Sequence, residues 1–372
     1  MSDVAQQDGS TPRLALVLAG GGIPGWMYEI GCLTALDDFF DTFSINQFDL
    51  YVGTSAGAAV AAFMANGVKP RAIYDDICND RKSGFNFVRR DIYSFGYQET
   101  WQIIKKLVRS LAPITRHFLS GRNRFSILDL LLLLEENLPS GIFTLDNLCH
   151  SLAALFSREG YTDDFRKLKK ALYIPAVDLN MGRYDVFGTE PFLDIPISQA
   201  VTASSAMPIL FQPVHIRGKA YIDGGVSRVA HIDIALNHGA KMVWVVNPVQ
   251  YIVNDGTHIC LTNMSGKCAG IQDKGLSYIY DQAMRISTST RIYLGFKRYV
   301  LEHPDKQFFL IQPKPSDSLL FAHTAVSFDS RIEILKYGYA STAQTLKDNY
   351  TYYQQCLKAY DISVTLDRFQ DP

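Results

Sequence analysis

The chain has 372 residues, of which 47% are hydrophobic and 20% charged, and its formal net charge is −1. This composition is that of a globular protein large enough for one big domain or two modest ones. A charge so close to zero excludes a global field that would attract nucleic acid or an anionic membrane, so either partner would need a local basic patch.

The N-terminal segment 1–12 is polar, and we expect it to be a disordered tail. It lacks the basic start and apolar core of a secretory signal peptide. The most hydrophobic stretch, 127–134, is far shorter than the roughly 18 apolar residues that cross a bilayer. These features predict a cytoplasmic protein without a signal peptide or a membrane-spanning segment. Export by a signal-less route would leave no mark in the sequence.

The six cysteines are scattered along the chain without the C-x-x-C spacing of a zinc site or a redox motif. In a chain of this length they predict reduced thiols, not a disulfide framework. We therefore expect no structural metal. The cysteines are Cys32, Cys78, Cys149, Cys260, Cys268 and Cys356.

Two strand–loop–helix units open the chain. The apolar run 13–19 predicts a buried strand, and apolar residues at three- and four-residue steps predict a helix over 26–39. A second strand is expected over 48–52, followed by an alanine-rich helix that ends at Asn66-Gly67. Two such units in succession indicate a parallel sheet in an α/β fold.

The segment 80–125 has a different character. It contains ten Lys or Arg residues, interleaved with aromatic residues, and three acids. Two interpretations stay open: a surface helix docked on the core, and a lid or membrane-facing insertion with a basic rim. We expect the leucine run 127–134 to be a core helix.

Strand-like runs resume in the second half of the chain. They lie at 171–177, 184–187, 219–222, 242–246 and 307–313, and a helical pattern covers 331–360. Since there is no internal repeat and no convincing linker, we expect a catalytic domain over 13–250 that includes the 80–125 insertion. A helical extension with a late strand, 251–372, is expected to pack on the same domain.

The pentapeptide G-T-S-A-G at 53–57 matches the G-x-S-x-G pattern of a nucleophile elbow. In that motif a sharp strand-to-helix turn exposes the serine hydroxyl, and Gly53 and Gly57 avoid clashes inside the turn. The predicted strand before Ser55 and helix after it supply the required context. We therefore take Ser55 as the candidate nucleophile.

A serine nucleophile needs a base, and the histidines give no clear candidate. None of the candidate histidines that follow Ser55 lies in a distinctive loop. The candidates are His215, His231, His238, His258, His303 and His323. The distinctive acid is Asp223, which follows a strand-like run and precedes Gly224-Gly225. Glycines at these positions allow a close approach to another loop.

The first glycine-rich loop, G-G-G-I-P-G at 20–25, satisfies the G-x-G-x-x-G pattern of dinucleotide sites. That hypothesis requires an acid that ends the second strand and binds ribose. The second strand runs instead into the serine turn, which disfavours a cofactor. If the first two strands are neighbours, the amides of this loop form an oxyanion hole beside Ser55.

In combination the three sites resemble the patatin-like acyl hydrolases, which include phospholipases A and neutral lipid hydrolases. The family pattern is G-G-G-x-[RK]-G, then G-x-S-x-G, then D-G-[GA], and it appears here in order at 20–25, 53–57 and 223–225. The resemblance covers about 14–246 and includes the connecting run "AVTASSAMPILFQPV". It implies a three-layer α/β/α fold with a mainly parallel central sheet and a helical insertion.

The resemblance also implies a Ser55–Asp223 dyad that hydrolyses lipid or other acyl esters through an acyl-enzyme, without metal or cofactor. The oxyanion hole would be formed by Gly20, Gly21, Gly22 and Ile23, and Gly25, Gly53, Gly57, Gly224 and Gly225 would support the motifs. Peripheral membrane contact would fall to 80–125, and no nucleic acid is involved.

One residue departs from the family pattern. Pro24 stands where the pattern has Arg or Lys, and proline has no amide to donate. Because proline suits the first turn of a helix, we still expect a working hole built on the remaining amides. Two alternatives stay open on the same scaffold: a soluble carboxylesterase or thioesterase, and a non-catalytic acyl-binding protein.

Overall fold

The computed structural model describes most of the chain outside the N-terminal tail and the insertion. The described residues are 13–81, 84–95, 140–228, 230–256, 260–263, 265–317 and 328–370. The expected tail 1–12, most of the 80–125 segment and the leucine run 127–134 lie outside them.

The central sheet is mostly parallel and follows the order β13-β10-β1-β2-β5-β9-β8. Its parallel strands are β1 (Arg13–Leu18), β2 (Leu50–Gly53), β5 (Ala171–Asp178), β10 (Ala240–Val246) and β13 (Gln307–Ile311). Its antiparallel strands are β6 (Arg183–Phe187), β8 (Val214–Ile216) and β9 (Lys219–Asp223). The predicted parallel α/β fold is therefore confirmed.

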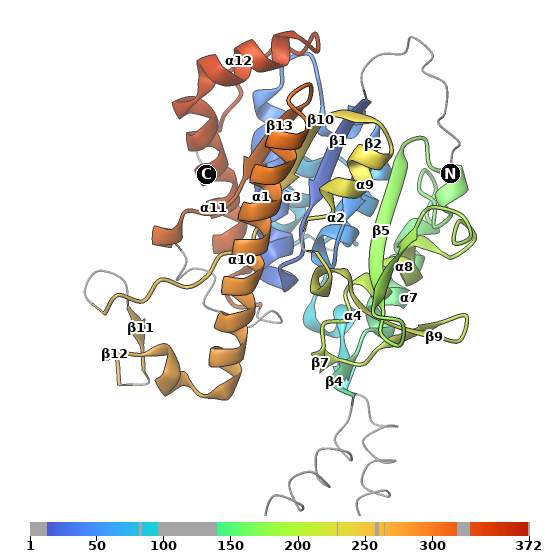
Figure 1. The fold of residues 1–372 in the computed structure, drawn as a ribbon, viewed down its shortest axis with the longest axis vertical. Helices are drawn as coiled ribbons and strands as arrows, with labels where there is room; N and C mark the ends of the chain where they lie inside the picture. Colours follow the sequence, from blue (N-terminus) through green and yellow to red (C-terminus); the bar gives the residue numbers. More distant parts are fainter. Residues whose placement is uncertain are drawn as a thin grey trace, which may run out of the picture.

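Helices cover both faces of this sheet and give three layers (Figure 1). Along β1, Leu16 and Leu18 point into one apolar cluster and Ala15 and Val17 into another. Strands buried on both faces need such continuous apolar runs. The first face carries α1 (Gly22–Phe39), α2 (Ala56–Ala65), α8 (Ile197–Ser204) and α11 (Arg331–Asp348); the second carries α9 (Ile232–Asn237) and α10 (Leu276–Glu302).

Helix α1 is almost entirely buried and begins at Gly22, four residues before the predicted start. The difference arises because the first turn contains Gly22 and Pro24. The regular apolar spacing by which the helix was predicted begins only after this turn. Helix α11 approaches α1 closely: a Cβ built on Gly31 would lie 2.2 Å from the carbonyl oxygen of Leu335. A single residue, Asn349, separates α11 from α12 (Tyr350–Lys358).

Smaller elements complete the described fold. A second, three-stranded sheet has the order β3-β4-β7, and among the helices found in the described ranges none is long and apolar enough to span a membrane. The remaining elements are α3 (Pro70–Cys78), α4 (Arg89–Ile92), α7 (Asp146–Phe156), β3 (Ser94–Phe95), β4 (Gly141–Thr144) and β7 (Ile209–Phe211).

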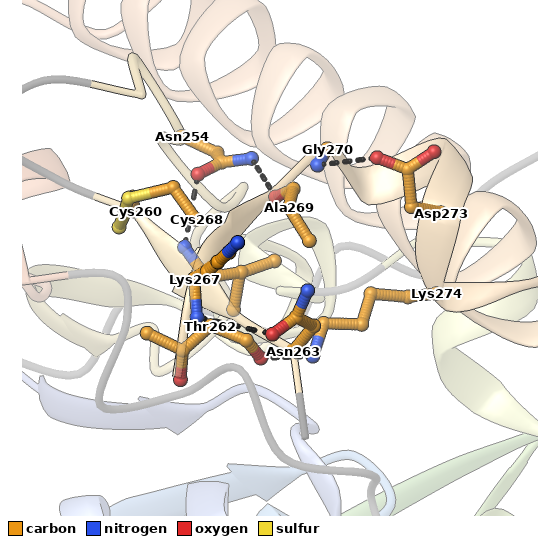
Figure 2. Close-up of a disulfide and its surroundings, with 11 residues drawn as sticks. Asn254, Cys260, Thr262, Asn263, Lys267, Cys268, Ala269, Gly270, Asp273 and Lys274 are labelled. Carbon is orange, nitrogen blue, oxygen red and sulfur yellow. Dashed lines mark hydrogen bonds between the residues drawn. A yellow bond between two sulfur atoms is a disulfide. The ribbon is translucent and has the colours of Figure 1, made fainter. Parts of the chain in front are cut away.

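A hairpin precedes α10 and corrects one expectation from the sequence. Its strands β11 (Leu261–Thr262) and β12 (Cys268–Ala269) are antiparallel, and Cys260 and Cys268 form a disulfide across them (Figure 2). The expectation that all six cysteines are reduced thiols is therefore wrong. Antiparallel pairing brings together two cysteines whose eight-residue spacing in the sequence matches no motif.

Candidate active site

Ser55 lies where β2 ends and α2 begins, in the left-handed backbone region with φ 56° and ψ −125°. Such a conformation is costly for a residue with a side chain and concentrates at functional sites. A Cβ built on Gly57 would lie 2.6 Å from the carbonyl oxygen of Leu18. One built on Gly53 would lie 2.4 Å from that of Gly57. The turn thus has the backbone of a nucleophile elbow, and both flanking positions require glycine.

Ser204, at the end of α8, anchors this turn. Its hydroxyl accepts a hydrogen bond from the Ser55 amide at 2.9 Å and donates one to the Pro175 carbonyl at 2.7 Å. The side chain of Ser204 is completely buried. Sequence reasoning missed this residue, although it lies within the "AVTASSAMPILFQPV" run that contributed to the family resemblance.

Asp223 is the last residue of β9, which pairs with β5, and its amide donates to the Ala206 carbonyl at 3.0 Å. Oδ1 accepts the Gly225 amide at 2.7 Å. Oδ2 is buried and has no hydrogen-bond partner within the described part of the chain. Burial raises the pKa of Asp223 to about 6, against the opposing influence of the Ser55 hydroxyl and the Gly225 amide.

The fold brings the serine turn and the aspartate loop together. Strand β5 pairs with β2 on one side, where Val52 is opposite Tyr173, and with β9 on the other, where Asp223 is opposite Ala176. The ends of β2 and β9 therefore lie close together on either side of the middle of β5. Here a Cβ on Gly224 would lie 2.3 Å from the Pro175 carbonyl oxygen and 3.2 Å from Thr54 Cγ2. Ser55 and Asp223, both 5% exposed, line one cavity.

The glycine-rich loop lies beside the serine, because β1 and β2 are neighbours in parallel register. A Cβ on Gly20 would lie 2.7 Å from the Cβ of Ser55, so the bare backbone of the loop is in contact with the serine. Gly21 precedes α1, and Gly22 and Ile23 are its first two residues. Amides in the first turn of a helix have no partner within the helix and are free to bind an anion.

Pro24 occupies the third position of α1, and its ring is buried. An amide at this position would have no acceptor within the helix, so the proline removes no bond from α1. The following residue, Gly25, donates to the Gly21 carbonyl at 3.0 Å and starts the regular helical pattern. The loop therefore keeps a complete first turn despite the departure from the family pattern.

Ser55 lines two cavities of different character. The larger, of about 220 Å³, also contains Gly20, Gly21, Pro24 and Asp223. The smaller, of about 50 Å³, is mostly apolar, and Gly22 and Ile23 line it together with Trp26, Leu145, Leu148, Met207 and Phe211. The candidate oxyanion residues are thus divided between two cavities that both contain Ser55.

Helix α10 forms one wall of the larger cavity and brings polar groups that sequence reasoning did not find. The residues from α10 are Tyr280, Asp281, Met284, Arg285 and Thr288. Arg285 is 14% exposed, donates through Nε to Asp281 at 2.6 Å and through Nη1 to the Gln250 carbonyl at 3.3 Å. The sequence analysis placed this helix only within the helical extension 251–372, because none of these side chains belongs to a recognised motif.

Among the described residues, no histidine forms a hydrogen bond with the Ser55 hydroxyl. His231 contacts the aspartate loop: it is fully buried, and its Nε2 lies 3.3 Å from the Gly224 carbonyl oxygen. Burial lowers the pKa of His231 to about 4. His215 lines another cavity and His238 stacks on Tyr173. His258 and His323 lie outside the described residues, and His303 ends α10.

Comparison with known proteins identifies the lineage of this site. The model of the patatin-like phospholipase family matches residues 16–236, more than half of the chain. The chain belongs to the patatin-like phospholipase family. The matched region contains the glycine-rich loop, Ser55 and Asp223. Within the described residues, no group of three or more His, Cys, Asp or Glu side chains could hold a metal ion.

The individual proteins similar to this chain are distant. A probable lipid hydrolase, 463L of Invertebrate iridescent virus 6, is 25% identical over 227 residues, which cover 61% of this chain and 64% of the viral protein. The crystal structure of VipD from Legionella pneumophila covers 91% of this chain, 67% of VipD, at 14% identity and a TM-score of 0.37.

A second structure is the complex of SpcU with ExoU from the type III secretion system of Pseudomonas aeruginosa. The match covers 94% of this chain and 62% of the matched chain, at 14% identity and a TM-score of 0.31. Scores this low carry no weight for function. The chain spans less than two thirds of the length of the viral protein.

Proposed function

We propose that the protein is a lipid acyl hydrolase that cleaves carboxylic esters through a serine acyl-enzyme. The observation that carries the proposal is the buried pair of Ser55 and Asp223, which line one cavity beside the amides of the glycine-rich loop. Membership of the patatin-like phospholipase family supports a lipid as the substrate.

In the proposed reaction the Ser55 hydroxyl attacks the ester carbonyl while the Asp223 carboxylate accepts its proton. The negative charge that develops on the carbonyl oxygen is stabilised by amides at the start of α1, with Gly22 and Ile23 as donors alongside Gly20 and Gly21. The leaving alcohol takes the proton, and water then hydrolyses the acyl-enzyme with Asp223 acting again as base.

The raised pKa of Asp223 supports its role as the base. An exposed aspartate has a pKa of about 3.9 and is a weak proton acceptor for a serine hydroxyl. With burial raising the pKa to about 6, the carboxylate of Asp223 is still ionised at neutral pH but binds a proton more readily. The unpartnered Oδ2 leaves an acceptor atom available for that proton.

The two cavities suggest how an ester would be oriented. The small cavity offers apolar side chains such as Trp26, Leu148 and Phe211, which suit the start of an acyl chain. The larger cavity contains the polar groups of α10, including Arg285 and Thr288, which suit the alcohol or head-group side. Peripheral membrane contact through 80–125 stays a prediction, since most of that segment lies outside the described residues.

The decisive experiment measures hydrolysis of p-nitrophenyl esters, phospholipids and neutral lipids by the wild type, Ser55→Ala and Asp223→Asn. We expect each substitution to lower turnover by about 10³-fold or more. Near-normal turnover by Asp223→Asn would refute the dyad. Activity confined to the water-soluble esters would favour a soluble carboxylesterase or thioesterase on the same scaffold. Failure of a fluorophosphonate to label Ser55 would favour a non-catalytic acyl-binding protein.

A further inference from the structure

Helix α10 carries an unusual share of the exposed apolar surface. Of the nineteen large apolar side chains that are exposed in the described residues, nine lie on this helix. They include Leu276 at 83% exposure and Leu301 at 70%, one at each end of the helix. Soluble proteins rarely leave contiguous apolar surface open without a function. The others are Ile279, Tyr280, Met284, Ile286, Tyr293, Leu294 and Val300.

The helical period separates two faces of α10. The inner face follows positions 281, 285, 288, 292, 296 and 299, and it includes Ile292, which is 7% exposed. We define the outer stripe as residues 276, 279, 283, 286, 290, 294, 297 and 301, which recur at three- and four-residue steps. The outer stripe is apolar except for Thr290 and Lys297. An ordinary surface helix would be polar along it.

Hydrogen bonds fasten α10 to the candidate active site. Arg291 donates through Nη1 to the Val226 carbonyl at 3.1 Å and the Ser227 carbonyl at 3.3 Å, in the loop that follows Asp223. Arg228, from the same loop, donates to the Tyr299 hydroxyl at 3.3 Å. The helix is therefore hydrogen-bonded to the aspartate loop at two positions, Arg291 and Tyr299.

The outer stripe is continuous with the mouth of the larger cavity. Tyr280 and Met284 line that cavity and are themselves 46% and 36% exposed, so they lie at its rim. Leu276 and Ala283 of the outer stripe lie four residues before and three residues after Tyr280, at steps that place side chains next to one another on a helix. If an apolar layer lies against the outer stripe, a molecule that leaves the layer can enter the larger cavity without passing through water.

The charges around the stripe favour an anionic layer. Lys297 lies within the stripe, and no acidic residue does. The exposed cations Arg291 and Arg298 are on the same helix. Its two acids are both paired, Asp281 with Arg285 at 2.6 Å and Glu302 with Arg298 at 2.9 Å. Figure 1 shows the N-terminal half of α10 projecting beyond the sheet, beside the β11–β12 hairpin. A helix that is apolar outside, with basic flanks, has the properties of an interfacial helix.

We propose that the outer stripe of α10 binds the surface of an anionic lipid bilayer and places the mouth of the larger cavity at that surface. The inference deepens the proposed function, since it names a bilayer as the source of the ester. The larger cavity then receives its substrate at the rim formed by Tyr280 and Met284.

The test is sedimentation with vesicles of phosphatidylcholine and phosphatidylglycerol, using the full chain with Ser55→Ala so that the lipid stays intact. We expect the double substitution Ile286→Ser and Leu294→Ser to weaken vesicle binding by at least about tenfold. The matched control is Leu179→Ser with Met181→Ser, which removes two side chains of 49% and 61% exposure outside α10. The control should bind like its parent.

Hydrolysis of a soluble p-nitrophenyl ester by the same substitutions in a chain with Ser55 intact separates this proposal from the proposed function. The α10 variant should retain it within about twofold, because neither residue lines a cavity that contains Ser55. If the chain binds vesicles but has no esterase activity, the membrane-binding role of the outer stripe stands and the proposed function is rejected. Failure of the parent to bind vesicles would overturn the proposal. Equal losses of vesicle binding in the α10 variant and the Leu179/Met181 control would overturn it as well. Loss of a stable dimer in the α10 variant alone would overturn it too, by assigning the stripe to a second copy.

Discussion

The Ser204 hydroxyl holds the Ser55 amide at 2.9 Å and ties it to the Pro175 carbonyl of β5, 2.7 Å away. Pro175 is also the residue against which Gly224 packs, so one short stretch of β5 supports both the serine turn and the aspartate loop. The relative placement of Ser55 and Asp223 therefore depends on a buried hydroxyl that takes no part in the chemistry.

Replacing Ser204 with alanine should loosen this arrangement. The substitution leaves the Ser55 amide and the Pro175 carbonyl without their partner, which costs about 1–3 kcal/mol of unfolding free energy for buried groups. We expect a lower kcat on a soluble ester with little change in KM, because the serine turn is displaced while the cavity remains. Urea unfolding and steady-state kinetics measure the two effects.

Ser157→Ala provides the control, since its hydroxyl donates to the Ala153 carbonyl on an exposed part of α7. It should change unfolding free energy by less than about 0.5 kcal/mol and leave kcat intact. Unchanged kcat in Ser204→Ala would show that the strained turn at Ser55 is maintained by the backbone alone.

Ester hydrolysis should rise with pH through about 6. Burial raises the pKa of Asp223 to about 6, and only its ionised form can accept the Ser55 proton. Below that pH the carboxyl is protonated, so kcat/KM should fall about tenfold for each further unit of pH. The profile of kcat/KM against pH on a neutral ester reports this group in the free enzyme. A limb centred near 4, the ordinary range of an aspartate, would contradict the effect of burial.

The sequence was informative where function depends on local backbone. The strand–turn–helix around Ser55 and the start of α1 are encoded by neighbouring residues, so their positions could be predicted to within a few residues. The closeness of Asp223 to Ser55 could not, because it results from the antiparallel pairing of β9 with β5. The glycines after Asp223 marked it as the distinctive acid, and the family resemblance made it the partner of Ser55.

Other features could not be predicted because they depend on contacts between residues that are far apart in the sequence or on the pairing of short strands. Ser204 reads as one small polar residue in a helix, and its role depends on β5 lying next to the serine turn. Helix α10 has its apolar stripe on the outside and polar side chains such as Arg285 on the cavity side, so the rule that the apolar face of a helix is buried does not identify its inner face. The Cys260–Cys268 disulfide depends on a two-residue pairing of β11 with β12 that no composition rule reveals.

Substitution of His231 distinguishes an aspartate base from a histidine base. Its imidazole is neutral near pH 7, since burial lowers the pKa to about 4, and Nε2–H donates to the Gly224 carbonyl beside Asp223. We expect His231→Asn to reduce kcat by about tenfold or less through the loss of this support, with the limb near pH 6 retained. A pH series on the variant measures both quantities.

His238→Asn is the matched control for His231→Asn, because His238 is stacked on Tyr173 and donates nothing to the aspartate loop. It should leave both kcat and the pH limb unchanged. A fall of about 10³-fold in His231→Asn together with loss of the limb would make His231 the base and reduce Asp223 to a supporting role.

Glu29 in α1 should limit the stability of the protein at neutral pH. Both carboxylate oxygens are fully buried without a hydrogen-bond partner in the described residues, and burial raises the pKa of Glu29 well above its ordinary value. The folded state thus retains a proton that the unfolded state releases above about pH 4.5, so stability falls as pH rises beyond that value. Glu29→Gln removes the ionisation, and we expect its Tm to exceed that of the wild type by at least about 2 °C near pH 7.5.

The difference between Glu29→Gln and the wild type should vanish near pH 4, where the carboxyl is protonated in both the folded and the unfolded states. Glu159→Gln is the control, because Glu159 is exposed and its neutralisation should shift Tm little at either pH. Calorimetry at the two pH values gives the comparison. A Tm gain that is the same at both would assign the effect to packing of the amide in α1, and a loss of stability at neutral pH would mean that the carboxylate is stabilised by a group opposite α1.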